Sequence, residues 1–245
     1  MVVLIIFFVF IVTAGIFISA VYIPPIHISD NTTMSDSITK LDDWLEKLHS
    51  DGKFNGSVLL AKGDEIIFSK SYTYEDIEEN KLVSESSSFN LASVSKQFTA
   101  MGVVLLKHQG KVTYEDRMTK FIPELKGYDE VTIQQLLHHT SGIPDYISLA
   151  NKHWREPGVF KTSDMISLLT KYNPPLKFSS GSKFEYSNTG YVLLAEIIAR
   201  ISRQPFSQFM SDNIFQPLGM DNTQVFNLVL IHKYAFISLF GLFYC

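Results

Sequence analysis

The sequence predicts a mixed α/β (α+β) fold, in which a helical region is combined with an antiparallel sheet represented mainly by one N-terminal hairpin. Two apolar stretches, residues 98–106 and 191–199, have the length and composition of buried helices. Residues 56–62 and 65–72 flank Gly63-Asp64 and are predicted to form the hairpin. The length of 245 residues suits one such domain with appendages.

The first segment, residues 1–23, is predicted to be a signal peptide or a membrane anchor. No charged side chain precedes Asp30, and although signal peptides usually begin with a basic region, the apolar run is also long enough to remain as an anchor. Either outcome delivers the chain across a membrane, so we expect a secreted or membrane-anchored, extracytoplasmic protein. Residues 24–35 begin with Pro24-Pro25 and read as a linker.

Residues 36–223 are predicted to form the folded domain. Its helices are expected, in chain order, over residues 41–48, 98–106, 165–169, 191–199 and 205–215. Gly52 and Gly110 stop the first two of these helices, Ser163 begins the third, and Pro205 lies in the first turn of the last.

The tail, residues 224–245, departs from this pattern because it is almost wholly apolar, with Lys233 as its single clear charge. Three interpretations remain. The tail forms a membrane helix, since roughly 20 apolar residues span a bilayer; it pairs with the exposed edge of the sheet; or it is read-through of non-coding sequence at a mis-predicted gene end, which we favour.

The charge and composition of the chain argue against a nucleic-acid partner and against a bound cofactor. A net charge of −4 and a pI of about 6.0 provide no basic footprint, so no nucleic-acid partner is expected. Cys245 is the only cysteine, which leaves stability to the core. His138 and His139 lack the further ligands that zinc needs. We therefore interpret them as structural or cleft-lining residues and expect no metal or organic cofactor.

The Ser-x-x-Lys pattern is the first chemical signal, and context selects one of its occurrences. The pattern occurs at Ser37/Lys40, Ser50/Lys53, Ser93/Lys96 and Ser180/Lys183. Ser37/Lys40 lies among charged residues typical of a protein surface. Ser50/Lys53 spans a turn, and Ser180/Lys183 lies in a loop that contains glycine. Only Ser93/Lys96 leads into a long apolar helix.

Ser93 and Lys96 have the spacing that an activated nucleophile requires. Residues three apart on a helix share a face, with Cβ atoms about 5–6 Å apart, so the amine can take the hydroxyl proton. Burial disfavours the charged form of a lysine, which suits a base, and the helix N-terminus favours developing negative charge. The alternative is that Ser93 is an N-cap and Lys96 a surface lysine.

Tyr186 and Asn188, just before the second apolar helix, supply the remaining chemistry. A phenol near a lysine can share a proton, and an amide can both donate to and accept from a substrate. The alternative is a helix-entry loop in which Asn188 is only a cap.

Residues 90–100 and 181–191 resemble the nucleophile segment and the second motif of class C β-lactamase-related serine hydrolases, within the serine β-lactamase-like and penicillin-binding-protein superfamily. Residues 54–62, 136–144 and 216–223 are similar to further segments of that family in the same order. The resemblance covers about residues 41–223 and implies the β-lactamase/transpeptidase-like fold.

The resemblance implies a role for each of these residues. Ser93 would be acylated, Lys96 and Tyr186 would manage its proton, and Asn188 would position the substrate. The predicted function is that of a serine hydrolase or acyl transferase acting on a β-lactam, a D-alanyl peptide or an ester, so the partner is a small-molecule or peptide substrate. Membrane association through the N-terminal segment and the tail is also considered. The alternative is a non-catalytic binding or scaffold protein, or an inactive fragment.

The family's third motif is expected to be missing. It consists of Lys or His, a small residue and Gly, on a strand after the second motif that supplies half of the oxyanion hole. Residues 161–163 lack the glycine and come too early, and residues 232–234 do not fit. Loss of one oxyanion donor typically costs about 10²–10³ in rate. We therefore expect a C-terminally incomplete domain that lacks the C-terminal sheet strands.

Overall fold

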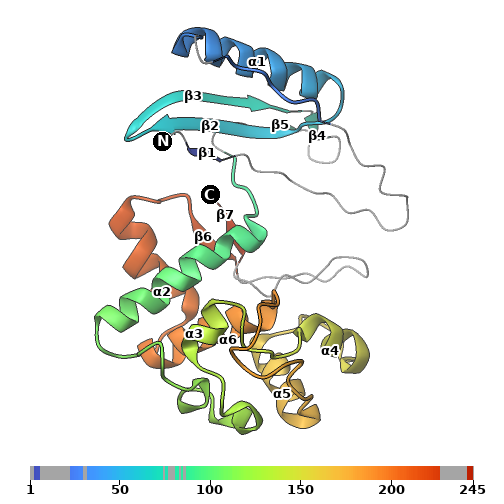
Figure 1. Ribbon diagram of the computed structural model, residues 1–245, viewed down its shortest axis with the longest axis vertical. Coiled ribbons are helices and arrows are strands. Elements are labelled where there is room, and N and C mark those ends of the chain that lie inside the picture. Colours follow the sequence, from blue (N-terminus) through green and yellow to red (C-terminus); the bar gives the residue numbers. More distant parts are fainter. Residues whose placement is uncertain are drawn as a thin grey trace. The chain divides into compact units, whose positions relative to one another are not determined.

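The computed structural model describes residues 3–5, 23–29, 32–73, 75–76, 81–82, 84, 87–226 and 242–244. The chain divides into two compact units, Met1–Ser87 and Ser88–Cys245 (Figure 1). Each unit is described by itself.

The first unit is a small antiparallel sheet with one helix against it. Strands β2 (Gly56–Lys62) and β3 (Glu65–Tyr72) form the predicted hairpin, in which Val58 is paired with Lys70. A third strand, β1 (Val3–Ile5), pairs with the other edge of β2, so the strand order is β1-β2-β3. A separate short ladder joins β4 (Glu75–Asp76) to β5 (Lys81–Leu82).

Helix α1 (Met34–Ser50) supplies the apolar stripe that packs on this sheet (Figure 1). Thr33 caps the helix by accepting a hydrogen bond from the Asp36 amide at 3.1 Å. The buried residues of the unit are spaced along α1 at helical intervals and along the strands at alternate positions. They are Leu41, Leu45, Leu48, Phe54, Val58, Leu60 and Tyr72.

Strand β1 was not predicted, because it comes from the segment interpreted as a signal peptide or anchor. Most of that predicted segment falls on residues 1–2 and 6–22, which lie outside the described residues.

The second unit is helical and is built around two helices that cross closely. These are α2 (Lys96–His108) and α6 (Asn188–Ser202). A Cβ atom at Gly102 would lie 2.9 Å from Ile198 Cδ1, so the lack of a side chain there permits the close approach. The α2 helix is amphipathic rather than buried all round, because Met101 and Val104 are exposed.

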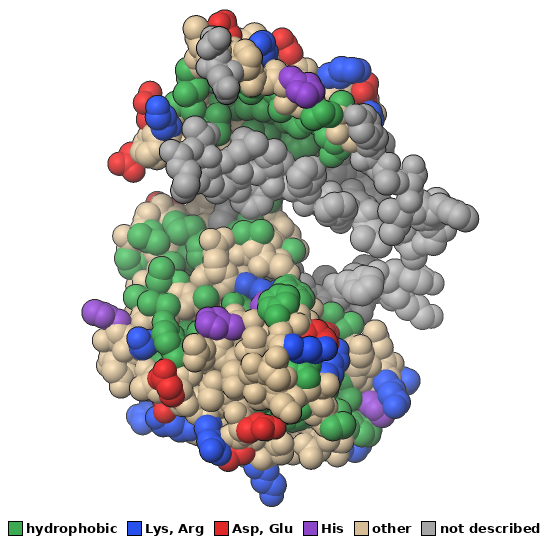
Figure 2. All heavy atoms as spheres, viewed as in Figure 1, with side chains coloured by type: hydrophobic (Ala, Val, Ile, Leu, Met, Phe, Trp, Pro, Cys, Tyr) green, Lys and Arg blue, Asp and Glu red, His purple; other side chains and the backbone are tan. Residues whose placement is uncertain are grey.

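The other elements of this unit surround that pair (Figure 1). The α-helices are α3 (Ile133–Leu137), α4 (Tyr146–His153), α5 (Thr162–Tyr172) and α7 (Phe206–Met210). The shorter turns are η1 (Ala92–Ser95), η2 (Met118–Lys120), η3 (Pro123–Tyr128), η4 (Ser211–Phe215, a π-helix) and η5 (Gln216–Leu218). On the face drawn in Figure 2, acidic and basic side chains are interspersed over this unit.

Several helices differ from the sequence prediction. Helix α1 starts at Met34, within the predicted linker and before residue 41, because Thr33 caps it there. Two further helices differ in their start or geometry. Helix α5 starts before Ser163, because the Asp164 carboxylate accepts a hydrogen bond from the Lys161 amide at 2.7 Å and closes the first turn. Residues 161–163, which were compared with the third motif, therefore lie at the start of a helix, whereas that motif lies on a strand. The helix expected over residues 205–215 changes from α to π geometry at Ser211.

Two short pieces of the tail are described. Strands β6 (Gln224–Phe226) and β7 (Leu242–Tyr244) pair antiparallel, while residues 227–241 lie outside the described residues. None of the helices within the described ranges combines the length and the apolar character that crossing a bilayer requires.

Candidate active site

Two loops carry most of the candidate site, and backbone hydrogen bonds hold them together. The loop after α3 and the loop before α6 are joined by Lys177 N–H to Gly142 O at 2.8 Å, Gly181 N–H to Thr140 O at 2.8 Å and Glu185 N–H to His139 O at 2.9 Å. Gly142 has a φ of +75°, and a Cβ atom there would lie 2.4 Å from Phe178 O. Only glycine fits this contact.

The start of α6 is fixed by Asp145 in the first of these loops. One carboxylate oxygen of Asp145 accepts a hydrogen bond from the Asn188 amide at 2.9 Å, and the other accepts from the Ile147 amide at 3.0 Å. The Thr189 hydroxyl accepts a hydrogen bond from the Tyr146 amide and donates one to Pro144 O, each at 2.8 Å. These contacts place Asn188 at the first position of α6.

Ser93 lies on the short turn η1, just before α2. The N-cap residues of η1 and α2 are Leu91 and Ser95, so the N-cap alternative does not describe Ser93. Ala92, the preceding residue, has a φ of +43°, which is unusual for a residue with a side chain. The Ala92 amide donates to Asn90 Oδ1 at 2.9 Å, and this bond supports the turn.

The four residues predicted from the sequence are joined by a chain of hydrogen bonds. Ser93 Oγ is 2.7 Å from Tyr186 Oη, and Lys96 Nζ donates to Ser93 Oγ at 3.0 Å. Lys96 Nζ also donates to Asn188 Oδ1 at 3.2 Å. Ser93 is exposed and Tyr186 is 47% exposed, so a substrate can reach the hydroxyl groups. Their chemical roles stay predictions.

Lys96 is the buried charge of the group. Its side chain is only 7% exposed, and this burial lowers the pKa of the Lys96 amine, opposed by the neighbouring Tyr186 and Asp145. The Tyr186 ring centre is 4.8 Å from Nζ and the Tyr191 ring centre 5.7 Å. A lowered pKa increases the neutral fraction of the amine, which is the form able to accept the Ser93 proton.

His139 is a neighbour of the site that the sequence interpretation left as structural or cleft-lining. Its ring stacks on Tyr186, with centroids 4.6 Å apart, and contacts Tyr191 at 5.1 Å. Burial and then the Lys96 charge lower the pKa of the His139 imidazole. The sequence signal was its place in residues 136–144, one of the stretches that carried the family resemblance, but no local pattern separated it from His138.

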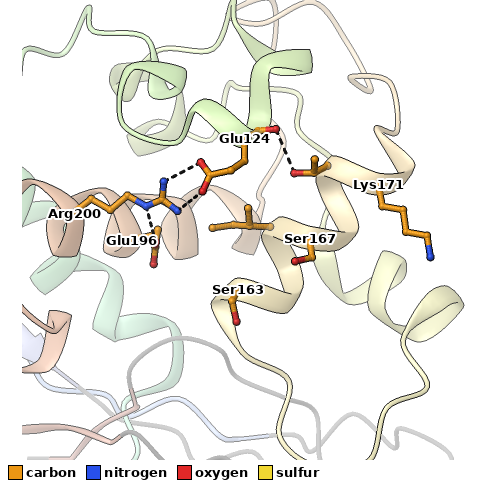
Figure 3. A pocket seen from close by; sticks show the side chains of 8 residues that line it. Glu124, Ser163, Ser167, Lys171, Glu196 and Arg200 are labelled. Atoms are coloured by element: carbon orange, nitrogen blue, oxygen red, sulfur yellow. Dashed lines mark hydrogen bonds and ion pairs between the residues drawn. The ribbon is translucent and has the colours of Figure 1, made fainter.

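A cavity of about 490 Å³ lies elsewhere in the unit, between η3, α5 and α6, and includes none of these residues. Figure 3 shows Arg200 between Glu124 and Glu196, with Ser163 and Ser167 on the neighbouring helix. Arg200 donates to both oxygens of Glu124 at 2.8 and 2.9 Å and to Glu196 at 2.7 Å. Within the described ranges, no cluster of three His, Cys, Asp or Glu side chains is arranged to hold a metal ion.

A mixed α/β fold that presents a serine, a lysine and a tyrosine in mutual contact defines the serine hydrolases of the β-lactamase fold. The family model described as Beta-lactamase matches residues 41–229, and the chain belongs to this family. The resemblance proposed from the sequence and the predicted fold class are thereby confirmed.

Among known relatives, penicillin-binding protein 4* of Bacillus subtilis is 38% identical over 187 residues, covering 76% of this chain and 41% of the relative. Among solved structures, a penicillin-binding protein from Bacillus halodurans matches with a TM-score of 0.66 and 28% identity, covering 77% of this chain and 58% of that one. A D-amino acid amidase from Ochrobactrum anthropi matches with a TM-score of 0.63 and 27% identity, covering 77% and 51%. The chain thus spans about two fifths of the Bacillus subtilis relative.

Proposed function

We propose that this protein is a serine hydrolase or acyl transferase that forms an acyl-enzyme at Ser93. The observation that carries the proposal is the position of Ser93 Oγ, which is within hydrogen-bonding distance of both the Lys96 amine and the Tyr186 phenol. A hydroxyl in contact with two proton-transferring groups is the arrangement that nucleophilic catalysis requires.

In the proposed reaction, neutral Lys96 accepts the proton of Ser93 as Oγ attacks the substrate carbonyl carbon. The C–O bond forms while the carbonyl π electrons move to oxygen, and the start of α2 favours the resulting negative charge. Collapse of this intermediate breaks the bond to the leaving group, which takes a proton from Tyr186. Tyr186 then regains a proton directly from Lys96, whose side chain hydrogen-bonds to it. Water or another nucleophile then attacks the acyl group by the reverse proton path.

Asn188 is proposed to position the substrate. Its Oδ1 atom accepts a hydrogen bond from Lys96 at 3.2 Å, which orients the amide group. The amide nitrogen carries two N–H donors, and we assign them to the carbonyl of the substrate's acyl side chain. The backbone N–H of Asn188 donates to Asp145 at 2.9 Å, which fixes the position of this residue at the start of α6.

The proposed substrates are β-lactams, D-alanyl peptides or esters, which present an activated or amide-like carbonyl. The names of two matched proteins, a penicillin-binding protein and a D-amino acid amidase, support acyl donors of the first two kinds. The proposed setting is secreted or membrane-anchored and extracytoplasmic, which is supported by the uncharged apolar residues 1–22. No nucleic-acid partner and no cofactor are part of the proposal.

Covalent labelling with a fluorescent penicillin tests the acyl-enzyme. The wild-type chain should label, and Ser93→Ala should not label while keeping its far-UV circular dichroism spectrum. The matched control is Ser37→Ala, because Ser37 begins another Ser-x-x-Lys pattern, lies half-buried on α1 and donates its hydroxyl to Thr33 O at 2.8 Å. Ser37→Ala should label normally.

Two outcomes would contradict the proposal. Labelling that persists in Ser93→Ala would place the nucleophile elsewhere. A folded wild-type chain that binds the penicillin reversibly but never labels would favour a binding or scaffold protein instead.

A further inference from the structure

The loop segment that carries Tyr186 is anchored on both sides by one residue, His139. Its backbone carbonyl accepts a hydrogen bond from the Glu185 amide at 2.9 Å, and its side-chain Nδ1 accepts one from the Ser187 amide at 3.1 Å. Tyr186 therefore lies between two amides that the same residue holds.

The His139 ring also fixes the direction of the Tyr186 side chain. The two rings stack with centroids 4.6 Å apart and an interplanar angle of 30°. The φ of His139 is +57°, a left-handed conformation that residues with side chains rarely adopt. Such a conformation persists only when its surroundings enforce it, and such residues cluster at functional sites.

The surroundings of the ring favour its neutral form. Tyr186 and Phe184 face it from the loop before α6, Tyr191 faces it from α6, and Lys96 acts on it from α2. Lys96 is the one group among these able to carry a positive charge, and it opposes a second cation beside it. A backbone N–H that donates to Nδ1 requires that nitrogen to be unprotonated, so a protonated ring would lose the Ser187 bond.

We propose that neutral His139 is a positioning residue for the reaction: through its stack on Tyr186 and its bond to Ser187, it keeps the phenol on Ser93, and protonation of His139 releases it. The inference rests on the proposed function, because it assigns how the Tyr186 hydroxyl is held in that reaction. His139 itself touches neither Ser93 nor a reacting atom; it acts through Tyr186.

Substitutions separate the two contacts. His139→Asn keeps an acceptor near the Ser187 amide and removes the ring, His139→Phe keeps a ring and removes the acceptor, and His139→Ala removes both. The rate constant of acylation by fluorescent penicillin should fall at least about tenfold in His139→Ala, since misplaced groups cost rate on this scale. The apparent affinity for the penicillin should stay within about twofold. The other two variants should be intermediate.

The pH profile distinguishes positioning from mere stabilisation. Wild-type acylation should show a decline at a pH below the ordinary histidine pKa of about 6.5, because the pKa of His139 is lowered and the ring gains its proton only there. In His139→Asn and His139→Phe the step of the profile that follows His139 should disappear, since neither side chain titrates, while the separate decline from protonation of the base Lys96 should remain. The matched control is His138→Ala, which changes the adjacent exposed histidine and should keep the wild-type rate and profile.

The outcomes separate this inference from the proposed function. If the wild type labels and His139→Ala labels at the same rate with the same profile, the positioning role is wrong and the acyl-enzyme stands. If the folded wild type never labels, the proposed function fails. The positioning of the phenol is then read from the Tyr186 ring resonances in NMR spectra. These should shift with the titration of His139 in the wild type but not in His139→Asn, and an unchanged titration would overturn the inference.

Discussion

The burial of Lys96 beside Ser93 lowers the stability of the fold and at the same time favours the neutral, reactive form of the amine. Most lysines keep their ammonium group in water, because removing it from water is costly. Lys96 is 7% exposed and donates to Ser93 and Asn188, which lessens this cost without removing it, since its pKa is lowered. The cost of burying this amine should therefore be measurable as a pH dependence of folding.

Lys96→Met isolates this effect. Because the folded-state pKa of Lys96 lies below 10.5, the unfolded chain binds more protons between that pKa and 10.5, and stability rises with pH in this window. The unfolding free energy of the wild type, minus that of Lys96→Met, should increase as the pH rises toward 10.5 in urea titrations. Lys47→Met, at a lysine that is 68% exposed, should show no such trend. A flat difference for Lys96 would contradict the prediction.

Tyr186→Phe should separate activity from stability. The change removes the hydroxyl that contacts Ser93, so the acylation rate should fall by about 10²–10⁴, the usual contribution of a positioned acid or base. Because Tyr186 is 47% exposed, the free energy of unfolding should change by less than about 0.5 kcal/mol. Labelling kinetics and urea titrations measure the two quantities. Tyr172→Phe, at another exposed tyrosine, should leave both unchanged.

Individual site residues differ in how far the sequence revealed them. Ser93, Lys96, Tyr186 and Asn188 were found because their spacing relative to the apolar helices is a local pattern. The contacts of His139 were missed, because it meets Tyr186 only after two loops come together. A sequence pattern identifies neighbours along the chain, and such a contact leaves no periodic signal.

At the scale of elements, Asp145 joins the starts of two helices. It accepts from the amide of Ile147, the second residue of α4, and from the amide of Asn188, the first residue of α6. Carboxylates are favoured at helix N-termini by hydrogen bonding and by the helix dipole. A single side chain thus sets the angle at which α6 presents Asn188. The sequence located both helices, but their ends depended on caps of this kind, which come from other segments.

Asp145→Ala should cost about 1–3 kcal/mol of unfolding free energy, since two helix starts lose an acceptor. Asp145→Asn keeps one acceptor oxygen and should cost less. Asp164→Ala, which uncaps the single helix α5, is the comparison and should fall near the lower end of that range, at about 1 kcal/mol. Urea titrations measure the totals, and hydrogen exchange at Ile147 and Asn188 locates the loss. Unchanged exchange at Asn188 in Asp145→Ala would refute the shared cap.

At the scale of the whole molecule, each unit has its own set of buried apolar residues. Leu45 is 1% exposed in the first unit and Leu193 is fully buried in the second. The sequence predicted the hairpin and the two central helices, because their patterns are strong and local. It did not predict that Val3–Ile5 pairs with β2, since that contact links segments more than fifty residues apart and needs no distinctive residue.

Leu45→Ala and Leu193→Ala should each cost about 2–5 kcal/mol, the usual penalty for emptying a buried leucine site. Hydrogen exchange should show lost protection in β2 and β3 for the first variant, and in α2 and α6 for the second. Leu59→Ala and Leu218→Ala, at leucines that are 49% and 69% exposed, are the matched controls and should change protection little. Equal losses from exposed and buried sites would argue against these cores.

The left-handed backbone conformation of Ala92 determines how a substitution at this position would affect the neighbouring Ser93. Glycine adopts a positive φ at no steric cost, whereas alanine there costs about 1 kcal/mol or more. Ala92→Gly would therefore relax the peptide and let the next residue sample more orientations. Such an exchange, although it removes strain from the backbone, would loosen the position of the nucleophile that follows.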